Sequence, residues 1–248
     1  MLLKTQRGMG KPQSNSMPIL EHVLRGIKRV HAKKAKPSLI CLPITPNILL
    51  KIRAIGEEDA KSFDNIMYWA VCCSCCFGFL RSGEICVPSP NKYDPTAHLS
   101  ITDIAVDSHD KPSIISLKIK VSKTNPFRKR VMVFLGHTGS TLCPVKALLA
   151  YISVRGQAPG PLFSFKKWQP LTREKLVSSL RAALERAGLD PKSYAGQAGH
   201  SFHSGAATAA HLNGIDDSTI MTLGCWKVTH ISGTSEYHRN IWQRSLLT

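Results

Sequence analysis

Apolar side chains recur at helical spacing near the start of the chain. From residue 18 to 35 they fall on one face of a predicted helix, and the opposite face is basic. The segment KPSLICLPITP that follows is interrupted by prolines and predicts a linker. A single helix in front of such a linker cannot form a domain by itself, so it is either an arm or the remnant of a larger N-terminal domain.

Two further helices are predicted before residue 80. Thr45 and Pro46 are typical of an N-cap and a first helical position, which places a helix over 46–55. A longer helix is expected from about residue 60 to 79. Its apolar part, 67–80, is shorter than the roughly 20 residues that span a bilayer, and a buried core helix is therefore predicted.

The periodicity changes in the middle of the chain. Three segments in which the helical spacing is lost, 100–107, 113–121 and 130–136, predict β-strands. The connections between them, DSHDKP and SKTNPFRK, are rich in turn residues. A small antiparallel sheet of three strands is therefore expected.

Helical spacing returns after Leu142, interrupted by an extended segment at 161–165. The segments with this spacing are, in order, 143–156, 171–189, 201–214, 216–226 and 234–247. The predicted fold class is α+β: a mainly helical domain with a small three-stranded antiparallel sheet.

Charge narrows the choice of partners. The 248 residues include 33 Lys and Arg against 16 Asp and Glu, which gives a net charge of +17. Such an excess favours a polyanion, most simply nucleic acid. The candidate phosphate-binding residues are Arg25, Lys28, Arg29, Lys33, Lys34, Arg128, Lys129 and Arg130, and the second group is preceded by Lys118, Lys120 and Lys123. Each run is alternatively a solvated surface, and the first also fits a nuclear import signal.

The eight cysteines raise the question of disulfides or zinc. Four of them, Cys72, Cys73, Cys75 and Cys76, crowd into one apolar segment without turn residues. Cysteines on one buried helix cannot easily pair, so they are predicted to be small apolar core residues in a reducing compartment. Zinc is the alternative, but CCSCC lacks a second ligand group at zinc-site spacing, and neither a metal nor another cofactor is expected.

Several polar residues at the ends of predicted elements have ordinary interpretations when taken singly. Arg81 follows an apolar helix and would pair with Glu84, Lys123 lies in a predicted hairpin, and His200 would cap the next helix. His200 and His203 also suggest a metal site. Paired metal ligands on a helix prefer a spacing of four rather than three, however, and no carboxylate or cysteine adjoins these histidines.

Taken in order, these stretches resemble a known catalytic domain. GFLRSGEI at 78–85, the basic hairpin, GHSFHSGAA at 199–207, LGCW at 223–226 and a tyrosine in the last helix are similar to the motifs of the tyrosine recombinase, or phage integrase, family. SKTNPFRKRV, LCPVKALLAY and LTREKLVSSLRAAL are similar to the versions carried by eukaryotic mobile elements of the DIRS and Crypton kinds. The resemblance runs from about Ile44 to Ile241.

The resemblance implies a particular chemistry. Members of this family exchange DNA strands by transesterification: a tyrosine hydroxyl attacks a phosphodiester, becomes attached to the 3′ phosphate and releases a 5′ hydroxyl, without a cofactor. On this pattern Arg81 binds the non-bridging oxygens, and Lys123 protonates the leaving oxygen. His200 matches the family's acid–base histidine, and Trp226 matches a position that holds histidine or tryptophan.

The chain departs from the family pattern at two positions. His203 stands where the family has its second arginine, and imidazole cannot make the forked phosphate contact of a guanidinium. Loss of one oxyanion donor costs roughly 100- to 1,000-fold in rate. Tyr237 aligns with the first tyrosine of the family's end helix, whereas Asn240 aligns with the second, which is the nucleophile. An extra segment, VTHISGT, precedes this helix, and Tyr237 serves as the nucleophile only if that segment redirects it.

The expected organisation has three parts. Residues 1–16 form a disordered basic tail, 17–43 form a helix and linker left from an N-terminal DNA-binding domain, and 44–248 form a tyrosine-recombinase-like catalytic domain. The expected partners are DNA and further copies of the chain on DNA, with no membrane and no small-molecule substrate.

The leading hypothesis is a nuclear DNA-binding protein of mobile-element origin, for DNA recombination and integration, whose activity is weakened or lost. The alternatives are a non-enzymatic DNA-binding module domesticated from a transposon and an unstable product of a decayed element. Replacing His203 with arginine is expected to raise the activity of a site that is otherwise intact.

Overall fold

The computed structural model describes residues 42–55, 61–121, 131–195 and 201–224. All of them belong to the second of the two units into which the chain divides, Ile40–Thr248. The predicted tail, the helix at 18–35 and the helix at 234–247 lie outside the described residues. Within these residues the α+β prediction is confirmed: they form helices and one three-stranded antiparallel sheet.

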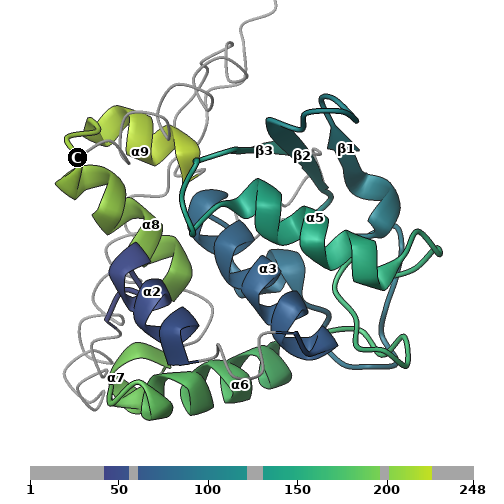
Figure 1. Ribbon diagram of the computed structural model, residues 1–248, viewed down its shortest axis with the longest axis horizontal. Coiled ribbons are helices and arrows are strands. Elements are labelled where there is room, and N and C mark those ends of the chain that lie inside the picture. Colours follow the sequence, from purple (N-terminus) through teal and green to yellow (C-terminus); the bar gives the residue numbers. More distant parts are fainter. Residues whose placement is uncertain (1–41, 56–60, 122–130, 196–200, 225–248) are drawn as a thin grey trace, which may run out of the picture. The chain divides into compact units, whose positions relative to one another are not determined.

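The described helices are α2 (Pro46–Ile55), α3 (Phe63–Phe77), α4 (Ser82–Ile85), α5 (Pro144–Arg155), α6 (Arg173–Arg186), α7 (Pro191–Ala195), α8 (Ser201–Leu212) and α9 (Asp217–Leu223). A 3-10 turn, η2, covers Ile101–Asp103, and the strands are β1 (Ile104–Val106), β2 (Ile114–Ile119) and β3 (Val131–Gly136). Figure 1 shows α3 between α5 and α8, and it contacts both of them.

The central helix, α3, supplies much of the core. Its four clustered cysteines are buried, and burial raises the pKa of Cys72 and Cys76 to about 12. These thiols are therefore uncharged near neutral pH and pack as small apolar groups, as predicted. No described helix is long and apolar enough to cross a membrane, and no three described His, Cys, Asp or Glu side chains are grouped so as to hold a metal ion.

The way in which α3 ends sets the position of the site. The Leu80 N–H donates to the Cys75 carbonyl at 3.0 Å, which is the bond of a Schellman cap, and Phe79 takes its left-handed position with φ of 51°. A Cβ on Gly78 would lie 2.8 Å from the Ser74 carbonyl oxygen and 3.1 Å from Val133 Cγ1. Glycine at this position lets the end of α3 pack closely against β3, and the chain then turns into α4.

The sheet has the order β1-β2-β3, and both pairings are antiparallel. Leu117 of β2 lies between Ile104 and Val133, and its neighbours on the same face are buried as the alternation predicts. The predicted first strand, 100–107, is partly wrong because 101–103 form a 3-10 turn. The cause is local: the Asp103 carboxylate accepts a hydrogen bond from the Ser100 N–H at 2.8 Å and caps that turn.

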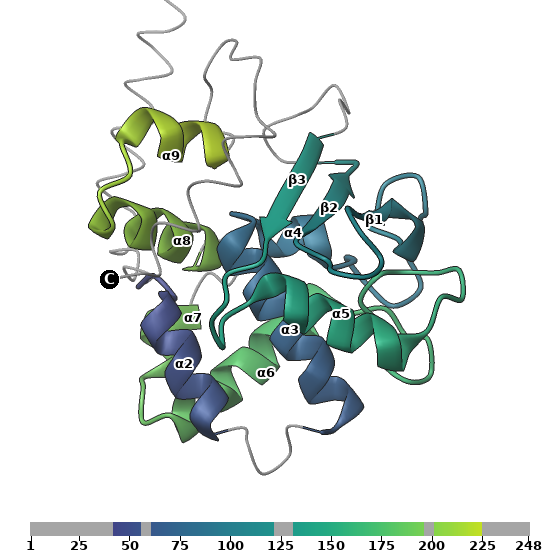
Figure 2. The same ribbon diagram turned by 45° about the horizontal axis from the view of Figure 1, so that its top comes forward.

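The small residues of α8 allow a close approach. A Cβ on Gly205 would lie 2.0 Å from the Ile44 carbonyl oxygen, and the Ile44 N–H donates to the Ser201 carbonyl at 2.9 Å. Helix α2 begins just after Ile44, and Figure 2 shows it beside α8. The short helix α7 was not predicted, although Asp190 in front of Pro191 is an N-cap signal and its carboxylate accepts from the next backbone N–H groups.

Candidate active site

Arg81 lies directly before α4, where the chain has just left α3. Its backbone N–H donates to Glu84 Oε2 at 2.8 Å, and its Nη1 donates to Oε1 of the same carboxylate at 3.4 Å. The two side chains are only 12% and 8% exposed. The predicted pairing of Arg81 with Glu84 is therefore present in the structure, but it involves only Nη1 of the guanidinium.

The other part of the guanidinium reaches residues far along the chain. Nη2 of Arg81 lies 3.3 Å from His203 Nε2 in α8 and donates to the Gly224 carbonyl, at the end of α9, at 3.4 Å. The structure thus brings together Arg81 and His203, two of the predicted site residues, which are 122 positions apart. Phe79, Glu84 and Gly224 complete this group, and the last is held in place by the C-terminal cap of α9.

His203 is buried, with 4% of its surface exposed. Its Nδ1 lies 2.7 Å from the Phe79 carbonyl oxygen, and the two rings meet edge to face with centroids 6.2 Å apart. A Cβ on Gly224 would lie 3.3 Å from both Cε1 and Nε2 of His203. The absence of a side chain at 224 therefore leaves room for the imidazole beside Arg81.

Arg81 has donors beyond those it uses. A guanidinium carries five N–H bonds, all of them donors. Within the described residues, contacts from Nη1 and Nη2 reach Glu84, His203 and Gly224, while Nε and the second Nη1 hydrogen meet no described acceptor. Within the described part of the chain, Arg81 is therefore a mostly buried cation with donors left for an anion.

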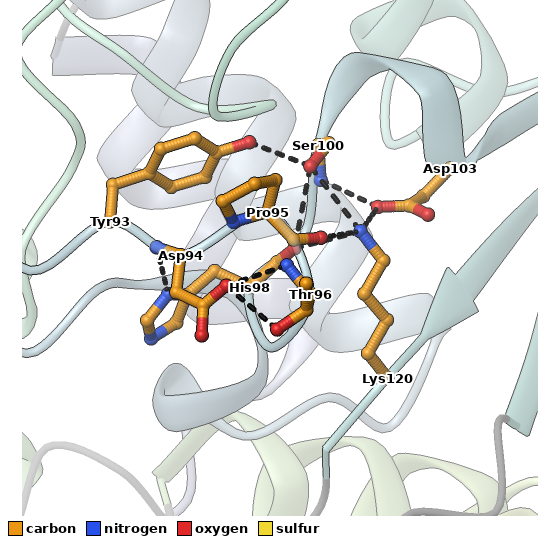
Figure 3. A network of polar contacts seen from close by, with 8 residues as sticks. All are labelled: Tyr93, Asp94, Pro95, Thr96, His98, Ser100, Asp103 and Lys120. Atoms are coloured by element: carbon orange, nitrogen blue, oxygen red, sulfur yellow. Dashed lines mark hydrogen bonds and ion pairs between the residues drawn. The ribbon is translucent and has the colours of Figure 1, made fainter.

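A second buried cation lies at the end of β2. Lys120 Nζ is 2.5 Å from Asp103 Oδ2 and donates to the carbonyls of Pro95 at 2.6 Å and His98 at 3.1 Å, with Ser100 Oγ at 3.3 Å. Figure 3 shows the ammonium pointing into this ring of oxygens. An ammonium has three N–H donors, so the four acceptors use all of them.

The loop around Lys120 is also fixed by its own side chains. The Tyr93 and Ser100 hydroxyls are 2.7 Å apart, and the Asp94 carboxylate accepts from the Thr96 N–H and hydroxyl at 2.8 and 2.7 Å (Figure 3). Lys120 therefore ties this loop to the end of β2. Nothing in the sequence distinguishes it from its basic neighbours, with which it was grouped.

The remaining predicted residues lie outside the described part of the chain. They are Lys123, His200, Trp226 and Tyr237 of the predicted catalytic set and Arg25, Lys28, Arg29, Lys33, Lys34, Arg128, Lys129 and Arg130 of the predicted DNA-binding set. Their assignments remain predictions.

No protein-family model matches the chain, and no curated protein matches it. Among solved structures, the XerH site-specific recombinase bound to its difH substrate in a pre-cleavage complex aligns with a TM-score of 0.53 and 17% identity, over 82% of this chain and 50% of XerH. The described chain has the tyrosine-recombinase catalytic fold. It spans about half the length of the XerH chain.

Two other solved structures are similar at lower scores. XerA recombinase aligns with a TM-score of 0.48 and 17% identity, over 84% of this chain and 61% of that one. A lambda integrase dimer bound to a COC′ core site aligns with a TM-score of 0.48 and 16% identity, over 84% of this chain and 50% of that one.

Proposed function

We propose that this chain is a DNA-binding protein of the tyrosine recombinase kind, in which Arg81 binds the phosphodiester that undergoes transesterification. In that reaction the Tyr237 hydroxyl attacks phosphorus and loses its proton to His200. The bond to the 5′ oxygen breaks, and that oxygen takes a proton from Lys123. The phosphodiester is conserved as a 3′-phosphotyrosine, so no cofactor is consumed.

The arrangement of Arg81 is the observation that supports this proposal most directly. Its guanidinium is largely withdrawn from water, is held from two sides by Glu84 and by His203 with Gly224, and keeps donors free of described partners. A cation in such surroundings stabilises negative charge more strongly than one in bulk water. The net charge of +17 supports a polyanionic substrate.

The recombinase fold and the sequence resemblance extend the proposal. XerH, whose fold the chain has, was solved bound to its difH substrate. The SKTNPFRKRV, LCPVKALLAY and LTREKLVSSLRAAL stretches support an origin in a eukaryotic mobile element, and the basic run at residues 25–34 supports a nuclear location. Assembly of several copies on DNA belongs to the same proposal.

A non-enzymatic DNA-binding module is the second candidate. It is favoured by His203, which occupies the position matched to a second arginine and uses both ring nitrogens in contacts with Phe79 and Arg81. A site with one phosphate-binding arginine binds DNA but stabilises a transition state poorly.

A DNA duplex carrying a nick near the scissile phosphate traps the covalent intermediate and distinguishes the two candidates. The enzyme predicts a protein–DNA adduct that survives denaturation and disappears in Tyr237→Phe. The module predicts no adduct but binding that weakens steeply as salt is raised, because released counterions drive it. Binding that is independent of salt would contradict both candidates.

A further inference from the structure

We infer that His203 is a positioning residue for Arg81: a neutral imidazole with its proton on Nδ1, whose Nε2 accepts a hydrogen bond from the guanidinium. His203 thus differs in kind from the phosphate donor expected at this position. The ring assignment is independent of any DNA chemistry. Its consequence for phosphate binding rests on the proposed function.

The Phe79 carbonyl fixes the first ring nitrogen. A carbonyl oxygen only accepts, so His203 Nδ1, at 2.7 Å from it, must carry a hydrogen. This acceptor cannot turn away easily. The Phe79 carbonyl shares its peptide group with the Leu80 N–H, which closes the cap of α3, and Phe79 itself has a left-handed φ of 51°. The end of the helix therefore fixes the orientation of this peptide.

Arg81 fixes the second ring nitrogen. The guanidinium only donates, and its Nη2 lies 3.3 Å from His203 Nε2. That contact is a hydrogen bond only if Nε2 presents its lone pair, which requires the neutral ring. A doubly protonated ring would bring two cations within 3.3 Å of each other at a position that is 4% exposed. Glu84, the charged partner of Arg81 among the described residues, is already engaged.

The two contacts determine where the spare donors of Arg81 point. Nη2 is held between His203 and the Gly224 carbonyl, and Nη1 is held by Glu84, so the guanidinium plane is defined on both sides. A side chain at 203 that only donates removes one of these supports. His203→Arg is therefore expected to disturb Arg81 instead of completing the site. Gln is the conservative replacement, since its amide oxygen provides an acceptor near the position of Nε2.

Long-range proton–nitrogen correlation NMR of the full chain, labelled with ¹⁵N-histidine, tests the ring assignment. The signals of His203 are identified among the ten histidines by their loss in His203→Gln. The expected pattern near pH 7 is a protonated Nδ1 and an unprotonated Nε2, with an Nε2 shift that moves in Arg81→Met. A hydrogen on Nε2, or an Nε2 signal unaffected by Arg81→Met, would overturn the inference.

The positioning role is tested by asking what Arg81 contributes to DNA binding in different backgrounds. The slope of log K against log salt is expected to fall by about 1 for Arg81→Met when residue 203 is His or Gln. In the His203→Ala and His203→Arg backgrounds the same change is expected to have little effect. Circular dichroism identifies the variants that fold. One folded variant, His203→Ala or His203→Arg, completes the comparison with His and Gln, and the Nε2 shift in Arg81→Met tests the contact without a change at residue 203.

The outcomes separate the two proposals. If Arg81→Met lowers the slope by about 1 in every background, Arg81 binds phosphate without help from His203, and only the positioning inference fails. If it changes nothing even with His203 in place, the proposed phosphate contact of Arg81 fails, whereas the NMR result still decides the ring assignment. If Gln does not preserve the effect of Arg81, an acceptor at 203 is not what positions the guanidinium.

Discussion

Lys120 and Arg81 are both largely buried cations paired with a carboxylate, but they differ in how many of their N–H donors have an acceptor among the described residues. The Lys120 ammonium is 2.5 Å from Asp103 and has three further oxygens around it, so every N–H is used. The Arg81 guanidinium is 3.4 Å from Glu84 and makes two other contacts of 3.3 and 3.4 Å. Lys120 is engaged in holding the fold, whereas Arg81 keeps N–H donors that meet no acceptor among the described residues.

The comparison shows that basic residues in this protein cannot be assigned to DNA by charge alone. Lys118, Lys120 and Lys123 appear equivalent in the sequence. Lys120 cannot contact a phosphate without first leaving Asp103 and the carbonyls of Pro95 and His98. A buried cation with enough fixed acceptors is a structural element, and a buried cation with too few is a candidate binding group.

The largest effect on stability is expected from Lys120→Met. The change removes the cationic partner of the Asp103 carboxylate, which is 6% exposed and keeps, among the described residues, only the bond from the Ser100 N–H, and it removes the Lys120 donor from two carbonyls. Removing one partner of a buried pair costs about 3 kcal/mol or more. Urea unfolding followed by circular dichroism measures the loss.

Lys118→Met is the matched control, because Lys118 lies in β2 only two residues before Lys120 and pairs with Met132 across the strands. Its effect is expected to stay within about 0.5 kcal/mol. Equal losses in the two variants would show that the Lys120 network does not stabilise the fold, and the contrast between the two cations would disappear.

Arg81→Met is expected to have a smaller effect on stability, about 1–2 kcal/mol. Its contacts are long, and the Glu84 carboxylate keeps its bond from the backbone N–H of residue 81 at 2.8 Å. The same urea measurement places this variant between Lys118→Met and Lys120→Met. A loss as large as that of Lys120→Met would mean that Arg81 is also a structural cation, which would weaken the proposed phosphate contact.

Strand β2 was predicted correctly because one of its faces is buried. Ile115, Leu117 and Ile119 alternate because β2 covers the core on one side only. The turn at 101–103 was mistaken for a strand because it runs directly into β1. The decisive bond from the Ser100 N–H to Asp103 is a local polar contact that periodicity does not register.

Only the part of the candidate site that consists of side chains could be predicted from the sequence. Arg81 and His203 were found from the order of their surroundings, and the Arg81–Glu84 pair from its spacing of three. The backbone carbonyls of Phe79 and Gly224 leave no trace in the sequence, because any residue type supplies a carbonyl. They contribute to the site only because the fold brings the ends of α3 and α9 together. The Phe79 carbonyl lies against His203 Nδ1, and the Gly224 carbonyl accepts from Arg81. For the same reason the acceptor role of His203 could not be foreseen.

Gly224→Ala is expected to change stability less than Arg81→Met and to act selectively on the Arg81 site. Gly224 has φ of −76°, a conformation that alanine adopts without strain, so the free energy of unfolding should change by less than about 1 kcal/mol. The new Cβ, however, would lie 3.3 Å from Cε1 and Nε2 of His203, and the ring must shift by a few tenths of an ångström. Because Nε2 is the atom that faces Arg81, its NMR shift should move towards that of Arg81→Met while the Lys120 network is unchanged. An unchanged Nε2 shift would mean that the ring tolerates the methyl group, and that the glycine at 224 is not needed to hold the two residues together.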